Sequence, residues 1–183
     1  SSDLLMLADA IEERGGRVVC LIPPDDTALT GLPYAAECGQ IVERGGEGLF
    51  LLPSMAVEHR KGERELWKPL AEAMGLRTVS LPGTWEAQGD VAWFRGRTLL
   101  FFGGRTDRAG VEGAASYFDD PLLVEVRQPA FHGNMAALPL PAADRMLVCA
   151  EVLVGDSLAR LRGAFGGEAL AEVSEGEIRS YAT

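Results

Sequence analysis

Two polar stretches contain the residue types that acid–base chemistry requires. His132 follows an apolar run and precedes Gly133-Asn134, and an imidazole titrates near neutrality, so it can both donate and accept a proton. Glu86 lies in a glycine-containing stretch, and Asp90 follows four residues later. Two such acids can bind a delocalised cation or orient the histidine. The alternatives are a structural or surface histidine, and a turn that exposes its acids to solvent.

Two arginines could each bind a carboxylate. Arg105 follows Gly103-Gly104, but this stretch lacks the Walker spacing with its lysine and the dinucleotide glycine pattern, which argues against phosphate binding. We interpret Arg105 as a carboxylate clamp or as a member of a structural ion pair. Arg60 precedes Lys61-Gly62 and has the same two interpretations, with a solvated loop as the default.

Several classes of site and partner are disfavoured. The chain has no Gly-x-Ser-x-Gly elbow, and its two histidines, His59 and His132, are too few for a histidine-rich metal site. We therefore expect no metal and no cofactor. The formal net charge of -10 argues against nucleic acid. Cys20, Cys38 and Cys149 have no close spacing and are expected to be reduced thiols.

The length of 183 residues with 47% hydrophobic residues predicts a single domain over 1–183. The longest apolar runs are of strand length, so no membrane span is expected. No secretory signal is visible at the start, which favours the cytoplasm. The chain begins without Met in a helical pattern and ends without a terminating element, and we expect it to be truncated at one or both ends.

The apolar runs and glycine turns predict an α/β fold in which a ββαβ unit occurs three times. A helix at 4–11 and a buried strand at 17–22 come first. The first unit has strands at 39–44 and 49–52, a helix at 63–74 and a strand at 77–81; Pro69 is expected to delay this helix to about Lys68. The second unit has strands at 91–94 and 97–102, a helix at 109–117 and a strand at 122–126. The third has strands at 135–138 and 145–149, a helix at 157–165 and a strand at 169–173.

Polar residues precede the first strand of each unit. Glu37 precedes the first unit, Glu86 and Asp90 the second, and His132 and Asn134 the third. A single ββαβ unit cannot bury both of its faces, so the units must pack together. If they pack around an axis, these polar residues face one another across its mouth and form one site.

Several motifs in the same order resemble the guanidine-modifying pentein superfamily, and most closely the bacterial dimethylarginine dimethylaminohydrolases and arginine deiminases. The resemblance covers nearly the whole chain. The motifs are Leu21-Ile22-Pro23-Pro24-Asp25-Asp26, Arg60-Lys61-Gly62-Glu63, Pro82-Gly83-Thr84-Trp85-Glu86-Ala87-Gln88-Gly89-Asp90-Val91, Arg105-Thr106, Phe131-His132 and Ser180-Tyr181-Ala182-Thr183.

The resemblance implies a pentein-type α/β propeller of five ββαβ units, of which this chain would contain about three to four. It implies that a cysteine thiolate attacks the guanidinium carbon, that His132 protonates the leaving amine and later activates water, and that Glu86 holds the guanidinium. Glu37 and Asp90 are the implied neighbouring acids, and Arg60 and Arg105 the implied arginines for the substrate carboxylate. A homodimer is also implied by analogy.

The chain departs from the family pattern at several positions. The family's nucleophilic cysteine would lie beyond Thr183. The acid expected near Gly31 is absent, Gln88 is an extra residue, and Asn134 replaces an aspartate. We therefore expect a hydrolase of a guanidine or amidine C–N bond. The alternatives are an amidinotransferase of the same superfamily and a non-catalytic binding module.

Overall fold

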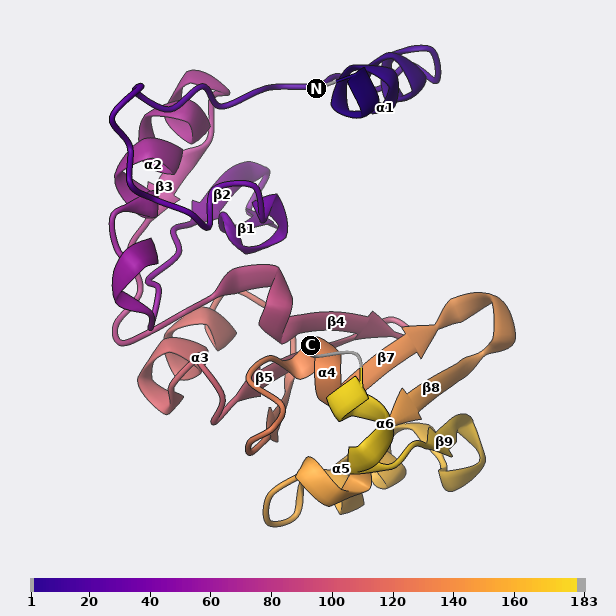
Figure 1. Cartoon of the computed structure of the whole chain (residues 1–183). Helices are drawn as coiled ribbons and strands as arrows, with labels where there is room; N and C mark the ends of the chain where they lie inside the picture. The colour runs from indigo at the N-terminus through magenta and orange to yellow at the C-terminus, as the bar shows by residue number, and fades with distance from the viewer. Residues whose placement is uncertain (1, 181–183) are drawn as a thin grey trace.

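The computed structural model describes residues 2–180, which form three three-stranded sheets with helices beside them (Figure 1). The first sheet contains β1 (Gln40–Arg44), β2 (Glu47–Leu51) and β3 (Arg77–Val79), with α2 (Glu63–Ala73) before the third strand. The second contains β4 (Val91–Phe94), β5 (Arg97–Phe102) and β6 (Leu122–Glu125), with α3 (Arg108–Ala115). The third contains β7 (Ala137–Leu140), β8 (Arg145–Val148) and β9 (Leu170–Glu172), with α5 (Ser157–Phe165).

The three sheets have one topology, which confirms the predicted ββαβ repeat. In each sheet the first two strands form an antiparallel hairpin, and the third strand pairs in parallel with the second. The helix makes the crossover that a parallel pair requires. The turns of the first two hairpins contain residues with positive φ, at Gly45-Gly46 and Arg95-Gly96. Such turns match the twist of the flanking strands, which explains the close agreement of predicted and observed hairpins.

Three predicted elements differ from the structure. The strand predicted at 135–138 begins at Ala137, because α4 (Gly133–Ala136) occupies the preceding residues. The helix expected to begin near Lys68 begins at Glu63 and continues through Pro69. The cost of the missing backbone bond is offset by packing of this helix, since Trp67 and Ala71 contact a cluster formed with Phe50 and Leu52.

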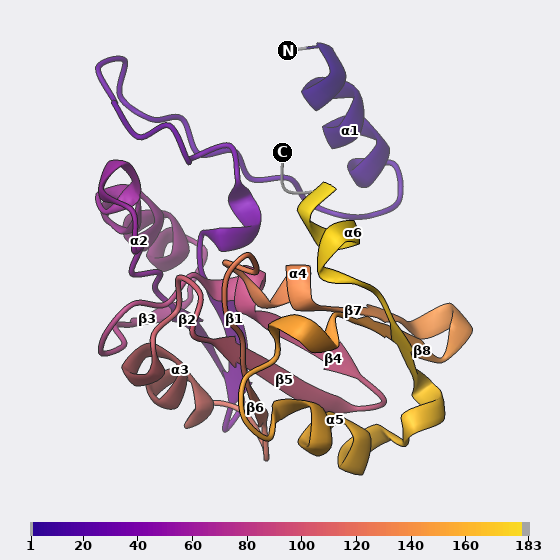
Figure 2. The ribbon, with the colours of Figure 1, turned by 60° about the horizontal axis from the view of Figure 1, so that its bottom comes forward.

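The strand predicted at 17–22 is absent, and these residues form an irregular segment after α1 (Ser2–Glu12). In each observed unit the third strand pairs with a preceding hairpin, whereas no described strand pairs with 17–22. Figures 1 and 2 both show α1 apart from the sheets. Its apolar side chains are accordingly exposed, among them Leu4, Met6 and Leu7. No helix among residues 2–180 is long and apolar enough to cross a membrane. The motif residues Tyr181-Ala182-Thr183 lie outside the described residues.

Neighbouring sheets share their cores. One buried cluster joins Leu51 of the first sheet to Leu100 and Phe102 of the second, and another joins Leu99 and Phe101 of the second sheet to residues of the third such as Met146. Successive residues of β5 thus face two different cores, as strand alternation requires. The short helices η1 (Ala35–Glu37), η3 (Ala87–Asp90) and α4 meet where these sheets adjoin.

Truncation of a buried side chain on β5 should strongly destabilise the fold. Leu99 is fully buried between two sheets, so Leu99→Ala should lower the free energy of unfolding by about 2–5 kcal/mol. Ile41 is about half exposed on β1, and Ile41→Ala is the matched control, with an expected loss below about 1 kcal/mol. Urea unfolding measures both variants. Equal losses would contradict a core shared across β5.

Candidate active site

Four of the five polar residues predicted to converge do so in one cluster, whereas Asn134 is exposed and lines an apolar cavity instead. Glu37 ends η1, Glu86 precedes η3, Asp90 ends η3, and His132 directly precedes α4. Glu86, Asp90 and His132 are at most 1% exposed. Residues from the approaches to three ββαβ units therefore form one site, as the repeat predicted.

His132 lies among three carboxylates. Its Nδ1 is 3.1 Å from Asp90 Oδ2 and has hydrogen-bond geometry. Its Nε2 is 3.2 Å from Glu37 Oε1 and 3.3 Å from Glu86 Oε2. Neither of these two contacts has hydrogen-bond geometry, so Nε2 and Glu86 Oε2 are buried polar atoms without a hydrogen-bond partner among the described residues.

The carboxylates favour the charged form of the imidazole. Burial alone lowers the pKa of His132, but Asp90, Glu37 and Glu86 together outweigh burial and raise this pKa to about 11. Burial alone raises the pKa of Glu37, but the contacts with His132 and Arg60 outweigh burial and lower this pKa to about 2. Burial likewise raises the pKa of Glu86, and contacts with His132, the Ala56 amide and Arg105 reverse the direction, so its pKa is lowered. The geometry and these shifts describe an imidazolium between two carboxylates at neutral pH.

Asp90 and Glu86 are fixed by the backbone and by one hydroxyl. Asp90 Oδ1 accepts a bond of 2.8 Å from the Gly133 amide, and Asp90 Oδ2 accepts one of 2.7 Å from Thr106 Oγ1. Thr106 Oγ1 in turn accepts the Glu86 amide at 3.0 Å. Glu86 Oε1 accepts the Ala56 amide at 2.7 Å. These bonds hold both acids in place before any ligand arrives.

The packing leaves little room for movement of His132. A Cβ on Gly89 would lie 2.9 Å from His132 Nδ1, which is closer than real Cβ atoms approach a neighbour. Only glycine fits between Asp90 and the imidazole without a shift. The turn that contains Gly89 therefore helps to position the ring.

Arg60 is buried against carboxylates of its own chain. Its Nε and Nη2 bind Glu63 at 2.7 and 2.8 Å, and its Nη1 binds Glu37. Gly31, the position where an acid is expected in the resembled family, faces this pair, because a Cβ there would overlap Arg60 and Glu63. Arg60 thus joins the cluster through Glu37 and has its donors engaged.

Arg105 lies at the edge of the cluster. Its Nη1 is 3.6 Å from Glu86 Oε2, and its guanidinium stacks on the ring of Phe131 at 4.5 Å. Its side chain is 31% exposed, so its contact with Glu86 is weaker than a buried pair and its charge can reach a ligand. All six predicted site residues are therefore connected, although they make different kinds of contact.

Two supporting residues were not assigned from the sequence. Glu63 holds Arg60, and Thr106 joins Asp90 to the Glu86 backbone. Glu63 follows Arg60 by three residues at the start of α2, which is a spacing that brings side chains together. For Thr106 the sequence contains no comparable signal beyond its position beside Arg105. Its hydroxyl bridges two segments of the chain, and that contact depends on how the two segments pack.

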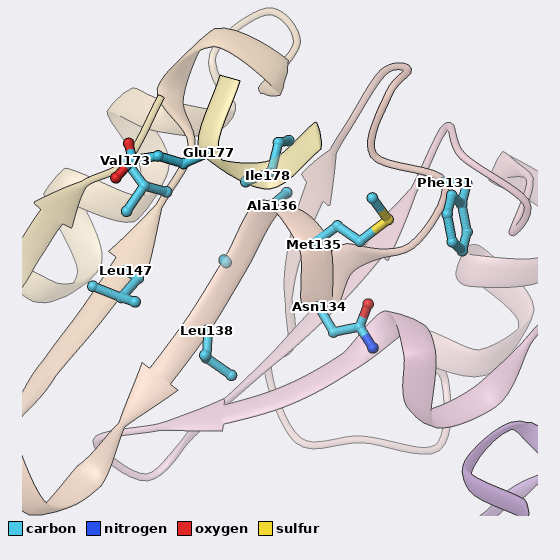
Figure 3. A pocket seen from close by; sticks show the side chains of 10 residues that line it. Phe131, Asn134, Met135, Ala136, Leu138, Leu147, Val173, Glu177 and Ile178 are labelled. Atoms are coloured by element: carbon cyan, nitrogen blue, oxygen red, sulfur yellow. The ribbon is translucent and has the colours of Figure 1, made fainter. Parts of the chain in front are cut away.

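An apolar cavity lies beyond His132. It has a volume of about 590 Å³, and Figure 3 shows Met135, Leu138, Leu147 and Ile178 around it, with Phe131 at one end. Phe131 also packs edge-on against His132, with ring centroids 5.1 Å apart. None of the three clustered carboxylates lines this cavity, so we place the chemistry at the polar cluster.

Two of the three cysteines have surroundings that disfavour a nucleophilic thiolate. Burial raises the pKa of Cys38 and also that of Cys149, and both therefore favour the unreactive thiol. Cys20 is exposed in the irregular segment between α1 and η1.

The raised pKa of His132 predicts that stability falls as the pH increases. The pKa of His132 in the folded chain, about 11, exceeds the ordinary value of 6.5. Protonation of His132 therefore stabilises the folded state fully below pH 6.5, and this stabilisation is lost as the pH rises through about 11. We expect the urea midpoint to fall between about pH 7 and about pH 10, and to fall less in His132→Gln. Parallel pH profiles of the two proteins would contradict an imidazolium at this position.

Comparisons with known proteins agree with the fold. No protein-family model and no curated protein sequence matches the chain. Solved structures do match: the cyanobacterial arginine dihydrolase ArgZ (18% identity, TM-score 0.77), a complex of AgrE with ornithine and NAD+ (19%, 0.79) and a dimethylarginine dimethylaminohydrolase, DDAH, from Pseudomonas aeruginosa with citrulline (16%, 0.56).

The matches cover nearly all of this chain but only part of the other proteins. They cover 97–98% of this chain, against 28% of ArgZ, 26% of AgrE and 82% of the Pseudomonas enzyme. For the N-terminal domain of ArgZ alone the share is 65%. At such identities the similarity concerns the fold alone: this chain has the fold of ArgZ, AgrE and the Pseudomonas enzyme over the matched residues.

Proposed function

We propose that this chain is the guanidinium-binding and acid–base part of a hydrolase that cleaves a C–N bond of a guanidine or amidine, with an arginine-like or dimethylarginine-like substrate. The observation that carries the proposal is that a carboxylate oxygen of Glu37 and one of Glu86 lie 3.2 and 3.3 Å from His132 Nε2, with Glu86 and His132 buried. Carboxylates so arranged bind planar cations through charge-assisted hydrogen bonds.

Glu86 is the main guanidinium acceptor in this proposal. Its Oε2 is buried without a hydrogen-bond partner, and its Oε1 is fixed by the Ala56 amide. A guanidinium N–H directed at Oε2 would satisfy an acceptor that otherwise stays unpaired at a cost. The lowered pKa of Glu86 keeps it charged for this contact.

His132 is the proton carrier. A cysteine thiolate attacks the guanidinium carbon, the imidazolium of His132 gives its proton to the departing amine, and a covalent thiouronium remains. The neutral imidazole then takes one proton from water, which attacks the same carbon. As the C–S bond breaks, the remaining proton of the added hydroxyl passes to solvent, which leaves the thiolate and a neutral urea-type product. The hydrogen bond from Nδ1 to Asp90 keeps Nε2 directed at the reacting atoms.

The thiolate comes from outside the described residues in this proposal. Cys38 and Cys149 have raised pKa values and Cys20 is exposed on a separate segment. We assign the nucleophile to sequence beyond Thr183 in a longer protein, within a propeller of five ββαβ units. The lengths of ArgZ and of the Pseudomonas enzyme relative to this chain support that assignment.

Arg105 is the better placed of the two arginines for a substrate carboxylate, since it is partly exposed beside Glu86. Arg60 would first have to leave Glu37. Solved structures of similar fold contain related ligands: AgrE has been solved with L-arginine and the Pseudomonas enzyme with citrulline. These ligands support the substrate class.

The binding step can be tested on the chain itself. Calorimetry should detect binding of methylguanidine and of L-arginine to the chain, in a buffer that contains a metal chelator. Glu86→Gln, which preserves shape but removes the charge, should weaken both by about tenfold or more, because a charged hydrogen bond contributes about 1.5–3 kcal/mol. Glu112→Gln, at an exposed acid on α3, is the control and should bind like the unaltered chain.

Turnover needs a longer protein that includes the nucleophile. Such a protein should convert an arginine analogue to a urea-type product and an amine. Transfer of the amidino group to an added amine instead of water would identify the transferase alternative. Binding without any turnover would identify the non-catalytic alternative, and absence of guanidinium binding would refute all three.

A further inference from the structure

We propose that Glu37, Glu86 and His132 form a binding site for a divalent transition-metal ion such as Zn²⁺. One ligand atom from each, His132 Nε2 and one carboxylate oxygen of each glutamate, lies within 4.8 Å of the other two. This site is independent of whether the chain binds guanidines, because it depends only on the cluster's own geometry.

Two of the three distances between the ligand atoms are close to those around a tetrahedral ion. Zinc lies about 2.0–2.2 Å from nitrogen and carboxylate oxygen, which places neighbouring ligand atoms of a tetrahedron about 3.3–3.6 Å apart. The distances from His132 Nε2 to Glu37 Oε1 and to Glu86 Oε2 are 3.2 and 3.3 Å, and the two glutamate oxygens lie within 4.8 Å of each other. Three protein ligands leave a fourth position for water or another ligand.

The two buried atoms without a hydrogen bond lie close together. His132 Nε2 and Glu86 Oε2 are 3.3 Å apart, in side chains that are 2% and 0% exposed, and neither has a hydrogen-bond partner among the described residues. A metal ion between them would satisfy both atoms. The mixed nitrogen and oxygen set of three ligands favours zinc or its neighbours over Mg²⁺ and Ca²⁺, which require more oxygen ligands.

The surrounding contacts are those that support a metal-bound histidine. His132 Nδ1 bonds to Asp90, and Asp90 is fixed by Gly133 and Thr106. A carboxylate at the distal nitrogen fixes the ring orientation and increases the basicity of the ligating nitrogen. Glu86 is held in turn by the Ala56 amide.

The formal charges also favour the exchange of a proton for a divalent ion. Four carboxylates of the cluster contact three cations, His132, Arg60 and Arg105, which leaves one net negative charge. Replacement of the Nε2 proton by a divalent ion adds one positive charge and makes the cluster neutral. A buried cluster is less costly when its charges balance.

The test is metal titration of the Cys20→Ser, Cys38→Ser chain, in which the accessible thiols are removed as competing ligands. Zn²⁺ should bind with one ion per chain in calorimetry, and Co²⁺ should give the intense visible absorption of a four-coordinate ion. Mg²⁺ should not bind. Zn²⁺ should also raise the unfolding midpoint, because it binds the folded state.

Single variants locate the ion. Zn²⁺ affinity should fall by about tenfold or more in each of the ligand variants Glu37→Gln, Glu86→Gln and His132→Asn. It should fall by about 10–100-fold in Asp90→Asn, because Asp90 orients the His132 ring. Glu112→Gln is the control and should leave binding unchanged. Circular dichroism confirms the folding of each variant. Lack of binding, or binding that survives all the ligand variants, would overturn the proposal.

Competition separates this proposal from the proposed function. Zn²⁺ and methylguanidine should exclude each other, because both need Glu86. If the chain binds methylguanidine in the presence of a chelator but does not bind Zn²⁺, only the metal-site proposal is refuted. A chain that binds Zn²⁺ but not methylguanidine refutes only the guanidinium site.

Discussion

The interaction on which the site depends is the contact of one buried imidazolium with three carboxylates. Desolvation of these charges is costly, and their mutual attraction offsets it only if the geometry is good and every partner is present. Glu37 comes from the approach to the first ββαβ unit, Glu86 and Asp90 from the approach to the second, and His132 from the approach to the third. The charged cluster is therefore complete only when the three units are packed, which couples the site to the shared cores on both sides of β5.

Much of the fold follows from local signals in the sequence. The strands at 91–94 and 97–102 were predicted with the observed bounds, because apolar runs flank a two-residue turn at Arg95-Gly96 that fixes the register. The apolar run 17–22 carries a similar local signal, yet it forms no strand. A strand requires a partner, and the availability of a neighbouring hairpin is a property of the whole chain that local patterns do not contain.

The composition of the site was more predictable than its contacts. Equivalent positions in the repeat and resemblance to a family brought the six candidate residues forward, and the structure connects them. The partners of each residue depend on packing: Arg60 binds Glu37 and Glu63, whereas Arg105 remains partly exposed at the edge. An arginine in a loop gives no sign in the sequence of which acids it will face. Thr106 was missed for the same reason, since its hydroxyl bridges two segments that meet only in the folded chain.

In the proposed function, the same carboxylates have two tasks that compete. Glu37 and Glu86 stabilise the imidazolium of His132 in the free protein, and they are also the groups available to a cationic ligand. A second cation that approaches them weakens their hold on the imidazolium proton, because like charges repel within the cluster. A ligand that binds there therefore lowers the pKa of His132 from its high value in the free protein. That change is in the direction an acid needs, since a proton held less tightly is more easily given to a leaving amine.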